Sequence, residues 1–380
     1  MNETPLHTLA AFGQSAWLDY ISRPLLETGK LKGLVEQGLM GMTSNPSLFN
    51  QSISATNDYD EKIVQLKEQG KTTFEIYDAL TIRDIQEACD ILKPVYEKTN
   101  GVDGYVSLEI NPQLANTVKE QAREGMRLYS VVKRPNVMIK VPSTPEGLPV
   151  VEELIGQGIN VNVTLIFSQK QYEETAKAYL RGLTRLSKTT PDLSKVHSVA
   201  SVFVSRVDTV IDKLLDDKIT KERREKDTAR LNQLLGRAAV ANGRFIFEKF
   251  EEIFNGPEFK ALAAKGAHPQ RVLWASTSTN NSAYQDIKYV TELISRPTVN
   301  TLPEKTLMAF LDHGQVKNAF TSSASESRKT IASLQEVGID LQKVCQDLLD
   351  DGVAAFVKAF DELLVSIEKK AAQLSAAGKK

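Results

Sequence analysis

The chain has 380 residues, of which 41% are hydrophobic and 25% are charged, a composition typical of a globular protein with a large apolar core. With 47 lysines and arginines against 48 aspartates and glutamates, it lacks the net charge that would attract nucleic acid or an anionic membrane. No segment has the roughly 20 consecutive apolar residues of a membrane-spanning helix. Because its first residues also lack the basic start of a signal peptide, we expect a cytoplasmic protein.

Short β-prone runs alternate with stretches of helical periodicity along most of the chain, which is typical of parallel strands joined by right-handed helical crossovers. The predicted strands, in chain order, are Ala16–Tyr20, Gly38–Thr43, Gly104–Ile110, Asn136–Val141, Gly158–Ile166, Val196–Val204, Arg271–Ser276 and Thr298–Thr301. Eight strands with helices between them predict an α/β fold, a closed (β/α)8 TIM barrel. A doubly wound open sheet is the alternative, although no glycine-rich dinucleotide motif follows any of these strands.

Several helices are predicted from capping residues and periodicity. One spans Pro112–Val132 after a possible Asn111 cap, another ends at Leu186 with Ser168 as its cap, and the charged run Lys218–Arg230 is interpreted as the start of a long helix that reaches Phe254. We expect a barrel domain at residues 1–302 with a helical insertion at about 57–98, followed by a helical extension at 303–380. The extension is expected to pack against the barrel, because apolar residues recur at helical spacing from Leu348 to Phe360. The alternative is that it covers the functional site.

Side-chain alternation along the strands locates a candidate site. Residues of one parity point into a barrel and those of the other pack under the helices, where they should be uniformly apolar. In the strand Asn136–Val141, Val137, Ile139 and Val141 form the apolar face, so Lys140 is predicted to point inward. The same rule turns a set of polar residues inward near the carboxyl ends of their strands, where barrel enzymes place their chemistry: Asp19, Asn45, Glu109, Asn162, Thr164 and Ser201.

Lys140 is the most informative of these residues, because a lysine within an apolar strand carries a burial cost unless it is paired, neutral or beside a cavity. A structural ion pair with Glu109 is the alternative reading. Taken singly, Asp19 or Asn45 could be a helix cap or turn residue, and Thr164 an ordinary strand residue. Because the whole set is predicted to meet at one end of the barrel, a functional site is favoured over these separate structural roles. An amine in a poorly solvated pocket can be neutral enough to attack a carbonyl and form a Schiff base, and Asp19 or Glu109 could then remove a hydroxyl proton during carbon–carbon cleavage.

Other site classes find little support in the sequence. The four histidines are scattered without metal-ligand spacing, and there is no nucleophile-elbow or P-loop motif. Cys89 and Cys345 are far apart and are expected to be reduced thiols, with a single disulfide as the alternative.

Five strand-end motifs in order resemble the transaldolases, and the chain length and the Trp17–Arg23 opening look like their longer bacterial form. The motifs are Thr43-Ser-Asn-Pro-Ser-Leu-Phe, Val106-Ser-Leu-Glu-Ile, Val137-Met-Ile-Lys-Val-Pro, Asn162-Val-Thr-Leu-Ile-Phe-Ser and Ser201-Val-Phe-Val-Ser-Arg-Val-Asp, and the resemblance runs from about Trp17 to Leu302.

That resemblance implies a (β/α)8 barrel enzyme that moves a dihydroxyacetone unit from sedoheptulose 7-phosphate to glyceraldehyde 3-phosphate. It makes Lys140 the Schiff-base lysine, Glu109 and Thr164 an acid/base pair acting through a water molecule, and Asp19 the base in cleavage. By the same resemblance, Asn45, Asn162 and Ser201 bind the hydroxyls of the ketose substrate, and Arg206 binds its phosphate. No cofactor or metal is implied, and the sugar phosphates are the expected partners of a monomer or homodimer.

Two positions bear on how the phosphate is bound and on whether the three-carbon unit is transferred or released. The family places a second basic residue after the seventh strand, where this chain has Asn280 and Asn281; Lys288 or another group could substitute, or phosphate binding could be weaker. Phe203 stands where the related fructose 6-phosphate aldolases tend to carry a tyrosine, and a side chain without a proton to donate is expected to favour transfer over release. The competing hypotheses are an aldolase-type lyase and a non-catalytic barrel that only binds.

Overall fold

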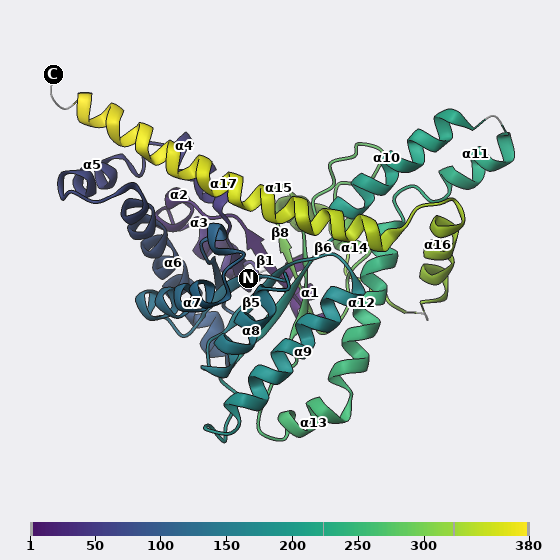
Figure 1. The fold of residues 1–380 in the computed structure, drawn as a ribbon, viewed down its shortest axis with the longest axis horizontal. Coiled ribbons are helices and arrows are strands. Elements are labelled where there is room, and N and C mark those ends of the chain that lie inside the picture. Colours follow the sequence, from purple (N-terminus) through teal and green to yellow (C-terminus); the bar gives the residue numbers. More distant parts are fainter. Residues whose placement is uncertain (1–2, 223, 322–323, 378–380) are drawn as a thin grey trace.

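The computed structural model describes residues 3–222, 224–321 and 324–377, and its centre is a closed barrel of parallel strands in the order β1 to β8 (Figure 1). The strands are β1 (Gln14–Asp19), β2 (Gly41–Thr43), β3 (Val106–Glu109), β4 (Val137–Pro142), β5 (Val161–Ile166), β6 (Ser198–Phe203), β7 (Arg271–Ala275) and β8 (Thr298–Leu302). Each predicted strand overlaps one of these. The (β/α)8 barrel is therefore confirmed, and the open-sheet alternative is wrong because β1 pairs with β8.

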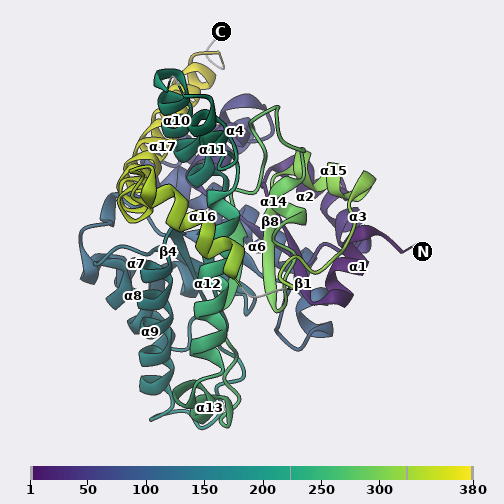
Figure 2. The ribbon, with the colours of Figure 1, turned by 90° about the vertical axis from the view of Figure 1, so that its right-hand side faces the viewer.

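Helices surround the barrel, with α7, α8 and α9 on one side of the strands and α1, α3 and α15 on the other (Figure 2). Those up to β8 are α1 (Pro5–Phe12), α2 (Arg23–Glu27), α3 (Lys30–Glu36), α4 (Pro46–Ala55), α5 (Asp60–Glu68), α6 (Thr73–Lys98), the 3-10 helix η1 (Pro112–Leu114), α7 (Val118–Val132), α8 (Gly147–Gly156), α9 (Gln169–Leu186), α10 (Ser205–Lys221), α11 (Glu225–Asn232), α12 (Ala238–Phe254), α13 (Pro257–Ala263) and α14 (Lys288–Thr291). Helices α5 and α6 lie within the stretch of about 57–98 where a helical insertion is expected.

Two helix predictions differ from the structure. The helix expected over Pro112–Val132 is divided, because Asn111 caps only the short η1 and Thr117 is extended before α7 begins. The helix expected from Lys218 to Phe254 is three separate helices. Gly236 interrupts it with a φ of +68°, which a right-handed helix cannot accommodate, and its N–H donates to Asp212 instead. The prediction for Ser168 is confirmed, since its hydroxyl accepts from the N–H of Gln171 at the start of α9.

The register of the strands sets the predicted polar residues side by side. Lys140 on β4 pairs with Glu109 on β3 and with Asn162 on β5. Asp19 on β1 pairs with Thr43 on β2. Asp19, Thr43 and Glu109 end their strands and Lys140 lies two residues before the end of β4, so these side chains gather near the mouth of the barrel, whereas Asn162 is only the second residue of β5.

After β8 the chain forms α15 (Glu304–His313), α16 (Ser325–Glu336) and the long α17 (Leu341–Ala377). In Figure 1, α17 is the yellow helix that runs from the side of α10 and α16 to the side of α4 and α5. It contacts α10, β5, η1, α6, α4 and α5 in turn. Residues 378–380, the end of the expected extension, lie outside the described residues.

Candidate active site

A cavity of about 220 Å³ opens at the carboxyl ends of the strands and contains most of the residues predicted from the sequence. Its walls include Asp19, Thr43, Asn45, Lys140, Thr164, Ser201, Phe203, Arg206, Ser276, Ser278, Thr301 and Phe356. Residues from β1, β2, β4, β5 and β6 thus meet in one place. The volume fits a small polar substrate, and the lining offers an amine, a carboxylate, several hydroxyls and a guanidinium.

Lys140 is buried in this cavity, with an exposed fraction of 5%. Its Nζ donates to the backbone oxygen of Ser44 at 3.3 Å and lies 3.8 Å from Glu109 Oε2. The second distance allows Coulomb attraction but is longer than a hydrogen bond. The ion pair considered as a structural alternative is therefore loose, and the amine also faces the cavity.

Glu109 and Thr164 lie on either side of Lys140 in the barrel. Burial raises the pKa of the Glu109 carboxyl to about 7, the nearby Asp19 adds to this, and the charge of Lys140 opposes it. Within the described part of the chain, Glu109 Oε2 and Thr164 Oγ1 have no hydrogen-bond partner. Both atoms can therefore exchange protons or hydrogen bonds with a substrate or solvent molecule.

A bulge in the pairing of β5 with β6 follows Val163, and Leu165 has a φ of +62°. A left-handed backbone is uncommon for leucine, and here it occurs directly after a candidate catalytic residue. The distortion places Thr164 on the cavity wall while Leu165 remains fully buried.

Asp19 occupies the end of β1. Withdrawal from solvent raises the pKa of its carboxyl, whereas Lys140, the Thr43 hydroxyl and Arg206 all favour the ionised form. Thr43 Oγ1 donates to Asp19 Oδ1 at 2.7 Å. The second carboxyl oxygen is thereby left to accept a proton from a bound hydroxyl. Asp19 is not a helix cap, because Ser22 caps α2.

The three residues expected to hold sugar hydroxyls differ in position. Asn45 caps α4 through Oδ1 and lines the cavity. Ser201 also lines it, and its hydroxyl donates to Asn162 Oδ1 at 2.6 Å. Asn162 is fully buried below the cavity and donates to Ser107 Oγ at 2.9 Å. The nitrogen and the oxygen of the Asn162 side-chain amide are thus both hydrogen-bonded within the barrel, and the bond to the oxygen orients Ser201.

Arg206 lies in the first turn of α10 and lines the cavity. Among the described residues it makes no ion pair, and Arg206 and Lys140 are the only cationic side chains of the cavity wall. Its guanidinium carbon is 5.1 Å from the centre of the Phe203 ring, which also lines the cavity. Burial lowers the pKa of Arg206, although Asp19 opposes this. An arginine held without a carboxylate partner is available to an anionic ligand.

The structure does not bring Lys288, the residue considered as a second basic group, to this cavity. Lys288 is buried, its Nζ donates to both carboxyl oxygens of Glu292 at 2.9 Å, and it lies outside this cavity. Asn280 and Asn281 are exposed and do not line the cavity either. The hydroxyls of Ser276 and Ser278 stand at the cavity wall after β7 instead.

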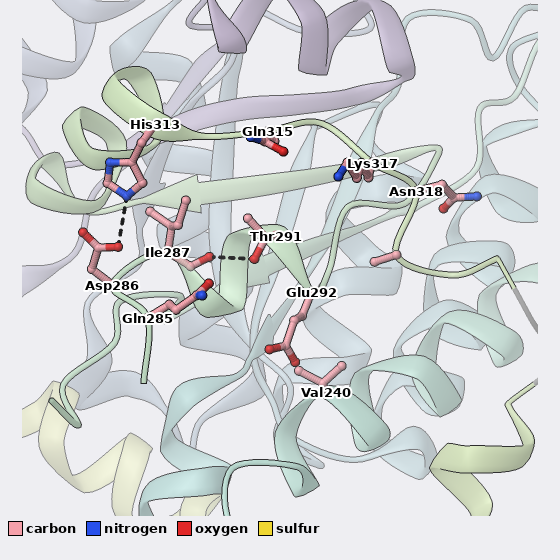
Figure 3. A pocket seen from close by; sticks show the side chains of 11 residues that line it. Val240, Gln285, Asp286, Ile287, Thr291, Glu292, His313, Gln315, Lys317 and Asn318 are labelled. Carbon is pink, nitrogen blue, oxygen red and sulfur yellow. Dashed lines mark hydrogen bonds and ion pairs between the residues drawn. The ribbon is translucent and has the colours of Figure 1, made fainter. Parts of the chain in front are cut away.

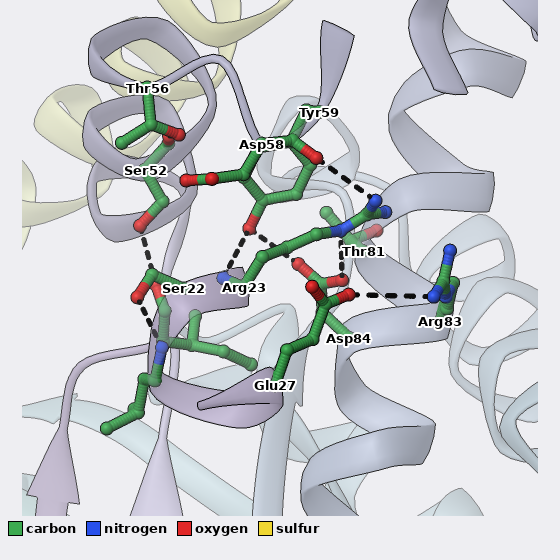
Figure 4. Close-up of polar contacts among 12 residues, drawn as sticks. Ser22, Arg23, Glu27, Ser52, Thr56, Asp58, Tyr59, Thr81, Arg83 and Asp84 are labelled. Carbon is green, nitrogen blue, oxygen red and sulfur yellow. Dashed lines mark hydrogen bonds and ion pairs between the residues drawn. The ribbon is translucent and has the colours of Figure 1, made fainter. Parts of the chain in front are cut away.

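Arg23, at the end of the Trp17–Arg23 segment, has a structural role that sequence reasoning did not assign. Arg23 is buried, its Nε donates to Asp84 Oδ1 at 3.2 Å, and Tyr59 donates to the other oxygen of Asp84 at 2.7 Å (Figure 4). Burial raises the pKa of Asp84 to about 6. This network ties the segment that follows Asp19 to α6 and to the turn before α5.

A larger groove of about 850 Å³ lies away from these residues, between α12, α14 and the segment after α15 (Figure 3). Its walls include Asp286 and His313, with Asp286 Oδ1 3.1 Å from His313 Nε2. None of the predicted site residues lines it. Elsewhere in the described chain, no three potential metal-binding side chains gather, and no helix is both long and apolar enough to cross a bilayer. Cys89 and Cys345 are buried and unpaired.

Comparison with known proteins decides the family. The model of the family "Transaldolase/Fructose-6-phosphate aldolase" matches residues 16–367. The chain belongs to this family. A "Transaldolase" of Trichodesmium erythraeum is 42% identical over 96% of this chain and 96% of its own length. A "Transaldolase 2" of a Nostoc species is 43% identical over 96% of this chain and 97% of its own, and a "Transaldolase" of Mycolicibacterium smegmatis is 43% identical over 98% of both.

Sequence reasoning about this family member missed Phe356. It comes from α17, and its ring centre lies 5.7 Å from Lys140 Nζ. The periodic apolar residues of α17 predicted that this helix packs, but not which of them reaches the barrel mouth. Ser276, Ser278 and Thr301 were also missed, because short polar residues at strand ends carry no strong signal.

The raised pKa of Glu109 predicts a pH dependence. Schiff-base formation needs a neutral amine, and the ionised Glu109 carboxylate, whose Oε2 lies 3.8 Å from Lys140 Nζ, is placed to accept the proton that the amine must lose. Below a pH of about 7 the Glu109 carboxyl is protonated and cannot accept it. We expect kcat/KM to rise as the pH increases through about 7, and Glu109→Gln, which cannot titrate there, to lose this rise. Profiles measured from about pH 5 to about pH 9 test this; an unchanged limb in the variant would assign it to another group.

Proposed function

We propose that the protein is a transaldolase that transfers a dihydroxyacetone unit from sedoheptulose 7-phosphate to glyceraldehyde 3-phosphate, giving erythrose 4-phosphate and fructose 6-phosphate. The observation that carries the proposal is the buried amine of Lys140, which faces a polar cavity 3.8 Å from Glu109 and beside Asp19. Such an arrangement suits carbon–carbon cleavage through a Schiff base and has no use in a protein that only binds.

The reaction starts with attack of the neutral Lys140 amine on the ketose carbonyl. Glu109, with Thr164 and a water molecule, supplies the proton that lets the hydroxyl of the carbinolamine leave as water. Asp19 then takes the proton of the substrate's C4 hydroxyl as the C3–C4 bond breaks, and the electron pair moves into the protonated imine. The first aldehyde departs and a three-carbon enamine remains on Lys140. Addition of the second aldehyde and hydrolysis of the imine complete the transfer.

The remaining wall residues suit recognition of the substrate. Asn45 and Ser201 present an amide and a hydroxyl to the cavity, and Asn162 holds Ser201 in place. Arg206 is suited to the phosphate because its guanidinium is otherwise unpaired among the described residues. No role in this scheme requires a metal ion or an organic cofactor.

A product assay separates transfer from release. Incubation with fructose 6-phosphate and erythrose 4-phosphate should yield sedoheptulose 7-phosphate and glyceraldehyde 3-phosphate in equal amounts, with little free dihydroxyacetone. Free dihydroxyacetone as the main product would indicate the aldolase-type lyase. Phe203 favours transfer, since it lines the cavity and has no proton to give to the enamine. Absence of both products would leave only a binding function.

Removal of the proposed phosphate ligand gives a second expected result. A hydrogen bond to a charged group contributes about 1.5–3 kcal/mol, so Arg206→Ala is expected to raise KM for fructose 6-phosphate by roughly 10- to 100-fold. The effect on kcat should be much smaller. Steady-state kinetics with unphosphorylated fructose provide the control, because its KM should not change. Equal increases for both sugars would show that Arg206 supports the cavity and does not bind phosphate.

The cytoplasmic location and the monomeric or homodimeric state expected from the sequence stay predictions. The unpaired thiols of Cys89 and Cys345 support the first.

A further inference from the structure

The long helix α17 meets the active-site cavity at one aromatic side chain. Phe356 lines the wall that also contains Lys140, Thr164 and Arg206, and it borders a second, small space beside Glu109. Its exposed fraction is 7%. Phe356 therefore forms an apolar part of the cavity wall beside the amine, with its ring centre 5.7 Å from Lys140 Nζ.

The barrel and the helix are fitted to each other at this point. Gly352 lies one turn before Phe356, and a Cβ at Gly352 would stand 3.0 Å from Leu165 Cδ2, closer than ordinary van der Waals contact. Leu165 is the residue whose left-handed backbone follows Thr164. Close approach of α17 at Gly352 thus depends on the distortion of β5 that also positions Thr164.

Other contacts hold the part of α17 that follows Phe356 in place. Gln113 of η1 donates to Asp361 at 2.7 Å, and Lys370 forms an ion pair of 2.7 Å with Asp60 and donates to the backbone oxygen of Ile53 at 3.0 Å. One turn after Phe356, Phe360 is fully buried and meets Tyr77 edge to face at 5.1 Å. With these anchors, the position of the Phe356 ring is determined by the whole helix.

We propose that Phe356 is a specificity-determining residue, which keeps water from the three-carbon intermediate on Lys140 and so favours transfer over release. This inference rests on the proposed transaldolase function. Release requires a proton to add to the enamine carbon and water to add to the resulting imine carbon. The carbon–nitrogen bond then breaks, the ketone leaves as dihydroxyacetone, and Lys140 recovers its amine. The ring, whose centre lies 5.7 Å from Lys140 Nζ, offers no proton to the enamine carbon and keeps a proton-donating water out of the space it fills, whereas the imine hydrolysis that transfer also needs uses the water placed with Glu109 and Thr164.

Three variants test the proposal in the full-length protein: Phe356→Ala, Phe356→Leu and the matched control Phe360→Ala. Each is assayed for dihydroxyacetone release from fructose 6-phosphate without an acceptor and for transfer to erythrose 4-phosphate. Phe356→Ala should raise the ratio of release to transfer by at least about tenfold, equal to about 1.36 kcal/mol between the two barriers. Phe356→Leu keeps apolar bulk and should raise it less. Phe360→Ala should lower the melting temperature but leave the ratio unchanged.

The ratio does not depend on how much of the protein is folded, so loss of stability alone cannot imitate the expected result. An unchanged ratio in both Phe356 variants, or an equal rise in Phe360→Ala, would overturn the proposal. The wild-type protein separates this failure from failure of the proposed function: a wild type that transfers the unit while the variants keep its ratio refutes only the role of Phe356. A wild type without transfer refutes the transaldolase function itself.

Discussion

Lys140→Arg is expected to abolish the reaction while leaving the barrel folded. Arginine keeps the positive charge beside Glu109, which lies 3.8 Å from the lysine Nζ, but its guanidinium stays protonated and cannot form an imine. Loss of a nucleophile commonly costs orders of magnitude, so we expect kcat to fall by at least roughly 10⁴-fold. Product formation measured beside the melting temperature of each protein tests this.

A second variant tests whether the larger side chain of Lys140→Arg, and not loss of the amine, causes the loss of activity. Arginine is longer than lysine and could displace α17 through Phe356, whereas Lys140→Met keeps an unbranched side chain that ends one atom earlier and removes the amine. Both variants should be inactive. Activity above a few per cent of wild type in Lys140→Met, a factor far smaller than nucleophile loss produces, would mean that Lys140 is not the nucleophile.

Asp19→Asn has the second largest expected effect. Because a positioned general base contributes about 10²- to 10⁴-fold, kcat should fall by that factor. The amide cannot take the C4 hydroxyl proton, so the Schiff base should form and then wait before cleavage. Borohydride added with fructose 6-phosphate should therefore trap an adduct that keeps all six carbons, detectable by mass spectrometry of the intact protein.

The neighbouring threonine offers the control for this variant. Thr43→Ser keeps the hydroxyl that donates to Asp19 at 2.7 Å and should leave kcat near wild type. A three-carbon adduct formed by Asp19→Asn at the wild-type rate would contradict the assignment, since cleavage would then proceed without the Asp19 carboxylate.

The barrel was predictable because its signals are local. Alternation of apolar and polar residues along β3 to β6 is a short-range pattern, and it placed Lys140, Thr164 and Ser201 on one wall before any contact was known. The capping of α9 by Ser168 was predictable for the same reason. The alternation does not show how deep in the barrel a side chain lies, however, and Asn162 is fully buried outside the wall of the cavity.

What could not be predicted depends on contacts between distant segments. The break between α11 and α12 follows from Gly236 and from its hydrogen bond to Asp212, and the charge pattern of the segment indicates neither. Lys288 follows the segment after β7 in which the resemblance places a second basic residue, but Glu292 one turn later pairs with it. Phe356 reaches Lys140 only because a helix formed more than two hundred residues later crosses the barrel mouth.

Reductive trapping tests the central claim most directly. The wild-type protein is treated with borohydride in the presence of fructose 6-phosphate, digested, and mapped by mass spectrometry. We expect a single modified peptide, with the reduced three-carbon adduct on Lys140, and no adduct when the sugar is omitted. An adduct on another lysine with Lys140 unmodified, or no adduct at all, would contradict a Schiff-base mechanism at this site.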